Sequence, residues 1–223
     1  MGRENRSDGR MNRSTRGDGH VLRYSENRRN PPENGTSRKK SIHGVVAHVT
    51  SETWLQGLPA QVNAQCRVLV LGSMPGNASL HAAQYYAHPR NRFWPLMAQL
   101  CGFDPQLEYP QRLACLHRAG VGVWDVIGRC QRRGSLDASI VRGSEVANPL
   151  PELLRRLPQV QVIACNGSAA AQAFERHVRP LLPEGGSPQV LALPSTSPAN
   201  AAWSLPRLLG EWGRLSPWLP GVS

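Results

Sequence analysis

Short apolar segments alternate with amphipathic ones along most of this chain. Four of the apolar segments contain few polar residues and are too short for helices, which is typical of strands buried on both faces of a parallel sheet. They span residues 67–71, 120–127, 160–165 and 190–193. The spacing of apolar residues elsewhere predicts helices over 93–101, parts of 111–118, 150–157, 168–177 and 201–215. This alternation indicates an α/β domain with a mainly parallel sheet.

The first 43 residues lack this pattern. They are rich in Arg, Asn, Ser and Gly and almost free of Ile, Leu, Val and Phe, so they cannot bury enough surface to offset the entropy lost on ordering. We therefore expect a disordered basic tail over residues 1–43 and one domain over residues 44–223. The tail either adds nonspecific affinity for phosphate or is dispensable, and the sequence leaves both readings open.

The charge balance suggests a polyanionic partner. The chain has 26 Lys and Arg against 15 Asp and Glu, with a formal net charge of +11, and both the tail and the domain are basic. Both lysines, Lys39 and Lys40, lie in the tail, so every cation of the domain is Arg, whose fork can bind phosphate or a base edge. A codon bias toward Arg explains this pattern equally well.

The five cysteines, spread singly without a C-x-x-C pair, argue against a zinc ribbon or an iron–sulfur cluster. Their odd number and apolar surroundings suit free thiols in a reducing cytoplasm. No stretch approaches 18 apolar residues, and the N-terminus has no apolar segment of the signal-peptide type. We expect a cytoplasmic protein without a metal or another cofactor.

Chemically distinctive loops follow all four predicted strands, where open parallel sheets bind their ligands. The first, Gly72-Ser-Met-Pro-Gly76, can bring main-chain N–H groups close to a ligand. It matches neither the dinucleotide nor the P-loop fingerprint, and a plain tight turn explains it as well. Asp125 near the end of the second strand is either a polar site residue or a structural carboxylate. Asn166 before Gly167 is a common turn signal.

The segment of residues 85–94 contains four aromatic residues, a histidine, an amide and two arginines. Such a mixture suits a flipped nucleobase, which needs a stacking ring, hydrogen-bond donors for its edge and cations for the flanking phosphates. In the structural alternative, Asn91 caps a helix that starts at Arg92, while Phe93 and Trp94 fill the core. The two readings are compatible.

The fourth loop, residues 193–200, is small, hydroxylated and stiffened by two prolines. This composition suits a loop that contacts a DNA backbone. The alternative is a loop closed by Asn200 as the N-cap of the last helix.

Together these segments resemble the uracil-DNA glycosylase superfamily, in particular its deoxyinosine (hypoxanthine) glycosylases. The resemblance rests on five strings in the same order within residues 66–215: Leu71-Gly-Ser-Met-Pro-Gly-Asn-Ala-Ser-Leu80, Tyr85-Tyr-Ala-His-Pro-Arg-Asn-Arg-Phe-Trp94, Trp124-Asp-Val126, Gly134-Ser-Leu-Asp137 and Leu193-Pro-Ser-Thr-Ser-Pro-Ala-Asn200. It implies a three-layer α/β/α sandwich with a four-stranded, mainly parallel central sheet.

The sequence also departs from the superfamily's pattern. Met74 stands where most members carry a catalytic Asn or Asp, and it can neither polarise water nor accept its proton. Leu193 replaces the usual His or Asn that opens the last motif. The hypoxanthine branch is similar in lacking the first of these residues, and the resemblance implies that Asn91 takes the catalytic part there.

We therefore hypothesise a monofunctional DNA glycosylase that flips a deaminated base, with hypoxanthine as the first candidate, out of double-stranded DNA and hydrolyses its N-glycosidic bond as a monomer. The expected catalytic residues are Asn91, which positions a water, and His88. The expected base-binding residues are Gly72, Ser73, Met74, Pro75, Tyr86, Phe93 and Asn166, with Phe93 stacked on the base. The expected DNA-binding residues are Arg90, Arg92, Ser195, Thr196, Ser197, Pro198 and Asn200.

Two other functions remain open at this point. One is the same fold acting chiefly on uracil or on mismatched thymine. The other is a noncatalytic DNA-binding module, for which Met74 is the best argument. Lyase activity is not expected, because the domain has no lysine to form a Schiff base.

Overall fold

The structure, a computed structural model, describes residues 54–183, 185 and 187–219. All of them belong to the unit that spans Val49–Ser223. The tail expected at residues 1–43 lies outside the described residues.

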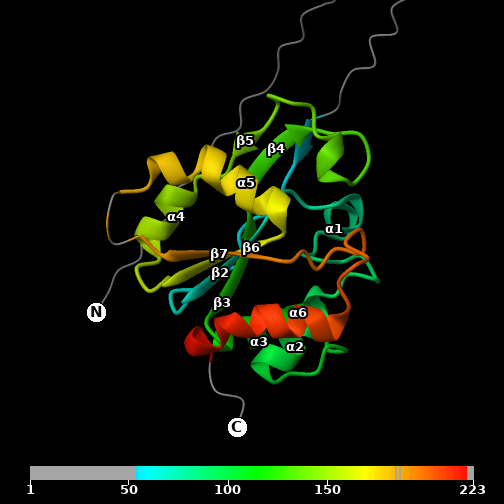
Figure 1. Cartoon of the computed structure of the whole chain (residues 1–223), viewed down its shortest axis with the longest axis vertical. Coiled ribbons are helices and arrows are strands. Elements are labelled where there is room, and N and C mark those ends of the chain that lie inside the picture. The colour runs from blue at the N-terminus through cyan, green and yellow to red at the C-terminus, as the bar shows by residue number, and fades with distance from the viewer. Residues whose placement is uncertain (1–53, 184, 186, 220–223) are drawn as a thin grey trace, which may run out of the picture. The chain divides into compact units, whose positions relative to one another are not determined.

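A parallel sheet runs through the middle of this unit (Figure 1). Its strand order is β3-β2-β6-β7, with β2 at Val68–Gly72, β3 at Val121–Asp125, β6 at Val162–Asn166 and β7 at Gln189–Leu193. Leu71 pairs with both Trp124 and Cys165, so the strands end at a common edge. Every residue of β2 and β3 is buried, as expected of strands covered on both faces. The four predicted strands are confirmed, although the second one ends at Asp125 and not at residue 127.

Helices cover both faces of the sheet (Figure 1). On one face lie α4 (Leu150–Arg156) and α5 (Ser168–His177). On the other lie α2 (Phe93–Cys101), α3 (Tyr109–Arg118) and α6 (Leu205–Trp212). The short α1 (Asn77–Ala82) follows the loop after β2. This arrangement confirms the expected three-layer α/β/α sandwich.

The last helix begins later than predicted. Its N-cap is Ser204, with a proline in the first turn, whereas the spacing of apolar residues had suggested a start at residue 201. Asn200 is therefore not the N-cap, contrary to expectation. Its main-chain N–H donates instead to Ser197 (3.0 Å), and its carbonyl accepts from Trp203 (3.3 Å), so this stretch is a set of turns. After α6 the chain continues in a 3₁₀-helix, η3 (Gly213–Trp218).

A second, antiparallel sheet was not predicted. Its order is β1-β4-β5, with β1 at Trp54–Gln56, β4 at Ile127–Gln131 and β5 at Val146–Ala147. The apolar run expected as one strand over 120–127 divides at Val126, whose N–H donates to the Gly72 carbonyl (2.9 Å). The chain thereby leaves the central sheet, and the connection from β4 to β5 carries a 3₁₀-helix, η1 (Asp137–Ser139).

No helix among the described residues is long and apolar enough to cross a membrane. No group of three or more His, Cys, Asp or Glu side chains within the same residues is arranged to hold a metal ion. All five cysteines lie within the described residues, and each is a free thiol.

Candidate active site

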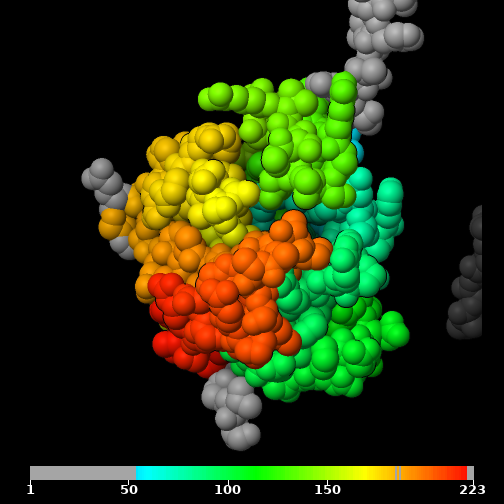
Figure 2. Space-filling view, turned by 45° about the vertical axis from the view of Figure 1, so that its right-hand side comes forward, coloured from blue at the N-terminus to red at the C-terminus, as the bar shows by residue number. Residues whose placement is uncertain are grey.

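A cavity of about 460 Å³ lies at the edge of the central sheet where the parallel strands end. Its wall consists of residues 72–79, part of 85–91, residues 135–137 and 195–199, together with Asp125 and Asn166. In Figure 2 the last loop (the fourth of the predicted loops, residues 193–200, orange) lies beside the blue-green segment that follows β2 and below the yellow-green segment that includes residue 135. The sheet therefore gathers the four predicted loops around one hollow.

The first loop is held by its carbonyl oxygens. Gly72 accepts from Val126 (2.9 Å), Ser73 accepts from Ile127 (2.9 Å), and Pro75 accepts from the Arg132 guanidinium (2.6 Å). The main-chain N–H groups of Ser73 and Met74 make no hydrogen bond to any other described residue. A loop pinned in this way has fixed N–H donors to offer to a ligand.

Glycine is needed at position 72. A Cβ atom there would lie 2.3 Å from Oδ1 of Asp125 and 3.8 Å from the Tyr86 hydroxyl oxygen. The missing side chain lets the Asp125 carboxyl pack directly against the end of β2, inside the wall of the cavity.

Asn91 and His88 both face this cavity. The Asn91 side-chain oxygen accepts the N–H of Phe93 (3.0 Å), the first residue of α2. The N-cap of this helix is Arg92, so the alternative that Asn91 caps a helix starting at Arg92 is wrong, although Asn91 still contacts the start of the helix. Nδ1 of His88 accepts the N–H of Arg90 (3.1 Å). A neutral His88 must therefore carry its proton on Nε2, which makes that nitrogen a donor.

Tyr85 and Tyr86 line the cavity, and Phe93 does not. Phe93 is completely buried and is absent from the cavity wall, which corrects the expectation that it stacks on the base. Its ring instead stacks behind that of Tyr86, with 3.8 Å between the ring centroids and 23° between the planes. Tyr86 has a left-handed backbone with φ of 56°, a strained conformation typical of residues presented for function.

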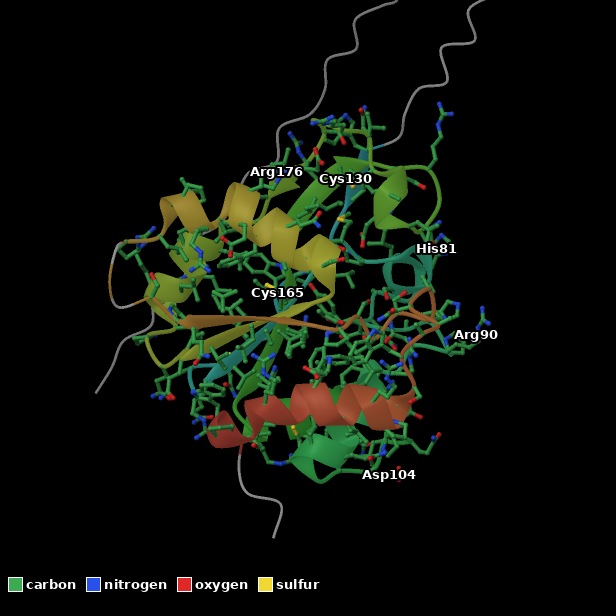
Figure 3. The ribbon with its side chains drawn as sticks, viewed as in Figure 1. His81, Arg90, Asp104, Cys130, Cys165 and Arg176 are labelled. Carbon is green, nitrogen blue, oxygen red and sulfur yellow. The ribbon has the colours of Figure 1, made fainter. Side chains whose placement is uncertain are left out.

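The two arginines beside Asn91 have different surroundings. Arg90 is exposed, lines the cavity and extends outward on the same side of the molecule as His81 in α1 (Figure 3). The Arg92 guanidinium donates to the carbonyls of Ser197, Asn200 and Trp203, and this corrects the expectation that it contacts DNA. It holds the last loop in place instead.

Asn166 joins the third and fourth loops. Its Nδ2 donates to the Thr196 hydroxyl (3.0 Å), and its Oδ1 accepts the Thr196 N–H (2.9 Å). Gly167 has φ of 103°, and a Cβ atom there would lie 2.8 Å from Cβ of Ser195. The pair at 166 and 167 is thus more than a turn signal, because it allows the two loops to touch.

The last loop meets its expected role only in part. Ser195, Ser197 and Pro198 are half-buried and line the cavity. Thr196 was expected to contact DNA, but it is completely buried, so its hydroxyl cannot reach a DNA backbone. Asn200 is absent from the cavity wall, and its side-chain amide donates to the Ser195 carbonyl (2.9 Å). Both residues shape the loop from within.

Sequence reasoning assigned no site role to one wall of the cavity, although the string Gly134–Asp137 was part of the family resemblance. Ser135, Leu136 and Asp137 lie there, and the Ser73 hydroxyl donates to Asp137 (2.6 Å). These residues follow a strand of the unpredicted sheet, so no local pattern placed them beside the first loop. Arg132 was missed as well, although it is buried and bonded to the carbonyls of Pro75 and Gly134.

Burial dominates the electrostatics of the cavity. It raises the pKa of Asp125 to about 7, with help from the nearby charge of Asp137, while the Tyr85 hydroxyl and the Arg132 guanidinium act in the opposite direction. Burial also raises the pKa of the Tyr86 hydroxyl far above its ordinary value, so this group stays protonated.

Comparison with known proteins agrees with this geometry. The family model of the Uracil DNA glycosylase superfamily matches residues 59–215. The chain belongs to this superfamily. It is 34% identical over 158 residues to a protein of Methanosarcina acetivorans named hypoxanthine DNA glycosylase, covering 70% of this chain and 94% of that protein.

Two further relatives point the same way. A hypoxanthine DNA glycosylase of Methanosarcina barkeri is 35% identical over 118 residues, covering 52% of this chain and 73% of that protein. The solution NMR structure of a protein from Methanosarcina acetivorans superimposes with a TM-score of 0.63 at 28% identity, covering 74% of this chain and 99% of the other. The superfamily resemblance seen in the sequence is confirmed.

Proposed function

We propose that this protein is a monofunctional DNA glycosylase that releases hypoxanthine from double-stranded DNA by flipping the nucleotide into the cavity. The observation that carries the proposal is the meeting of Asn91, His88 and Tyr86 with the first loop around one hollow at the sheet edge. Two superfamily relatives named hypoxanthine DNA glycosylases support this substrate over other damaged bases.

Hydrolysis of the glycosidic bond needs a water placed against the sugar. One lone pair of the Asn91 side-chain oxygen accepts the N–H of Phe93, which fixes the amide and leaves a second lone pair for a water. An amide orients water but is a poor proton acceptor, and Met74 offers no carboxylate to help. The enzyme is therefore expected to be slow, and the readily departing deaminated base offsets part of this.

The departing base gains negative charge, which the cavity must stabilise. The unbonded N–H groups of Ser73 and Met74 and the Nε2 donor of His88 are suited to this task, since they are fixed before reaction. Tyr86 offers its ring face to the base, with Phe93 supporting it from behind. Stacking on such a ring is worth about 1–3 kcal/mol per base.

The rim of the cavity is suited to duplex DNA. Arg90 is exposed there for phosphate contacts, and Ser195, Ser197 and Pro198 follow on the last loop. Leu136 lines the cavity with 57% of its surface exposed. Apolar side chains inserted between base steps are a known device for unstacking DNA, and we assign this part to Leu136. One chain supplies every group named, so a monomer suffices.

The direct test is an inosine-containing duplex incubated with the protein and then cleaved with alkali. Wild-type protein should give a cut at the inosine, and Asn91→Ala should give none while keeping its far-ultraviolet circular dichroism. Wild-type turnover by Asn91→Ala would rule out the assigned mechanism.

The same assay separates the alternatives. Faster cutting at uracil or mismatched thymine than at inosine would identify a pyrimidine glycosylase of the same fold. Salt-sensitive binding without any abasic product would identify a noncatalytic DNA-binding protein.

A further inference from the structure

A small pocket outside the active-site cavity contains two cysteine side chains. We call it the cysteine pocket; it has a volume of about 140 Å³ and is lined by Cys101, Gly102, Phe103, Cys115, Arg118 and Ala119. None of these residues belongs to the wall of the active-site cavity. Both cysteines are partly exposed, whereas the other three cysteines of the chain are buried. Among the five thiols, these two are therefore the ones that reagents from solvent can reach.

The packing of α2 against α3 brings the two thiols together (Figure 1). In the first turn of α2, the Trp94 ring packs against Tyr109 of α3, with 5.7 Å between the ring centroids, and against the Arg112 guanidinium, 4.5 Å from its centroid. Cys101 follows Trp94 by seven residues, or two helical turns, and so lies on the same face of α2. Cys115 follows Arg112 by three residues and lies on the same face of α3. Each cysteine therefore extends the face that its helix presents to the other helix.

The two thiols have different surroundings. Burial raises the pKa of the Cys101 thiol to about 12, and the nearby Cys115 sulfur adds to this effect, so Cys101 stays protonated. Cys115 instead accepts a hydrogen bond from the Arg118 guanidinium, with 3.0 Å between Nη2 and Sγ. A cation beside a sulfur favours the thiolate, which is the form that reacts. Arg118 is exposed, so the pocket is open to solvent on the side of Cys115. Cys115 is thus suited to react first and Cys101 to react second.

We propose that Cys115 and Cys101 form an oxidation site that reacts with small hydroperoxides and ends as a disulfide between α2 and α3. The pocket has room for such a reagent, because one water needs only about 10–15 Å³ of space of this kind and about 140 Å³ is present. This inference does not depend on the proposed glycosylase function.

The reaction has two steps. In the first, the Cys115 sulfur, which has given its proton to solvent, bonds to one peroxide oxygen and breaks the O–O bond. The displaced hydroxide takes a proton from solvent and leaves as water, and Cys115 is left as a sulfenic acid. In the second, the Cys101 sulfur bonds to the Cys115 sulfur, the S–O bond breaks, and the hydroxide leaves as water with the proton lost by Cys101. The two thiols lose two electrons in total, and the peroxide gains them. Because both sulfurs share one pocket, the second step is intramolecular.

The experiment treats the reduced full-length chain with hydrogen peroxide, blocks the remaining thiols and maps the tryptic peptides by mass spectrometry without a reductant. Trypsin cuts after Arg112, between the two cysteines, so the disulfide should appear as two linked peptides that dithiothreitol separates. Cys101→Ser should instead accumulate a sulfenic acid at Cys115, which dimedone traps. Arg118→Ala should form the disulfide about two- to fivefold more slowly, the factor that an exposed charged partner contributes. Arg156→Ala, on the exposed side of α4, is the matched control and should react as wild type does.

Each outcome decides the matter. Linked peptides from a chain that stays single in non-reducing electrophoresis support the inference. Peroxide that leaves both thiols reduced overturns it, and so do links between two chains or earlier oxidation of the buried thiols of Cys66, Cys130 and Cys165. A dimedone adduct at Cys101 of Cys115→Ser that forms as fast as the adduct at Cys115 of Cys101→Ser contradicts the order of the steps. The wild-type peptides decide whether the disulfide forms even if a variant does not fold.

Discussion

Replacement of Asp125 by asparagine should stabilise the protein at neutral and alkaline pH, apart from any effect on catalysis. The pKa of this carboxyl rises from an ordinary value of 3.8 to about 7 in the folded protein, mainly through burial. Above pH 4 the unfolded chain ionises Asp125 freely, while the folded chain cannot do so until about pH 7. The free energy of unfolding therefore falls as pH rises through this window and then levels off.

The magnitude follows from the size of the pKa difference. Each unit is worth about 1.36 kcal/mol, so the full loss is about 4 kcal/mol. About 2.5 kcal/mol of this loss of stability occurs between pH 5 and pH 8, where most other carboxylates do not titrate. Asp125 is almost fully buried, so solvent screening removes little of it. An asparagine at this position has no charge to bury and lacks the dependence.

Urea unfolding of wild type and Asp125→Asn at pH 5 and pH 8 measures the effect. The variant should gain about 2.5 kcal/mol relative to wild type between the two conditions. Glu152→Gln, on the exposed side of α4, removes one negative charge without changing the core and serves as the matched control. If the difference between wild type and Asp125→Asn is equal at pH 5 and pH 8, the carboxyl titrates normally and the reasoning is wrong.

Further predictions concern two residues at the rim of the cavity, Arg90 and Leu136, and Arg92, which holds the last loop. Arg90→Ala should weaken DNA binding and lower the slope of log affinity against log salt concentration by about one, with little change in stability. Arg92→Ala should instead destabilise the fold by about 2–4 kcal/mol, because it leaves the carbonyls of the last loop unpaired. Urea unfolding and DNA binding at several salt concentrations distinguish the two effects. Leu136→Ala should slow base release from a duplex and not from a single strand, since only a duplex has a stack to open. Leu181 is 66% exposed and lies outside the cavity wall, so Leu181→Ala is the control. If Leu136→Ala slows base release equally from duplex and single-stranded DNA, the assignment of Leu136 is wrong.

The sequence alone determined the central sheet, because its strands are nearly continuous apolar runs. A strand covered on both faces has few positions for polar residues, so β2, β3 and β6 were legible without tertiary information. The rule that parallel strands end at one edge then brought Gly72, Asn91 and Asn166 to a single cavity, as expected. The family resemblance was equally legible, since it rests on local strings.

Tertiary structure decided which of those residues face the ligand. The sequence does not distinguish Phe93 from Tyr86 as the stacking residue, because both are aromatic; packing places the Phe93 ring behind the Tyr86 ring. Arg90 and Arg92 are the same residue type, but only the Arg92 guanidinium binds the carbonyls of the turns at 197–203. The wall that contains Asp137 comes from a sheet whose pairing joins residues far apart in the chain, such as Leu55 with Cys130. Contacts of that range leave no local pattern, and this is why the surroundings of Asp125 emerged only from the folded chain.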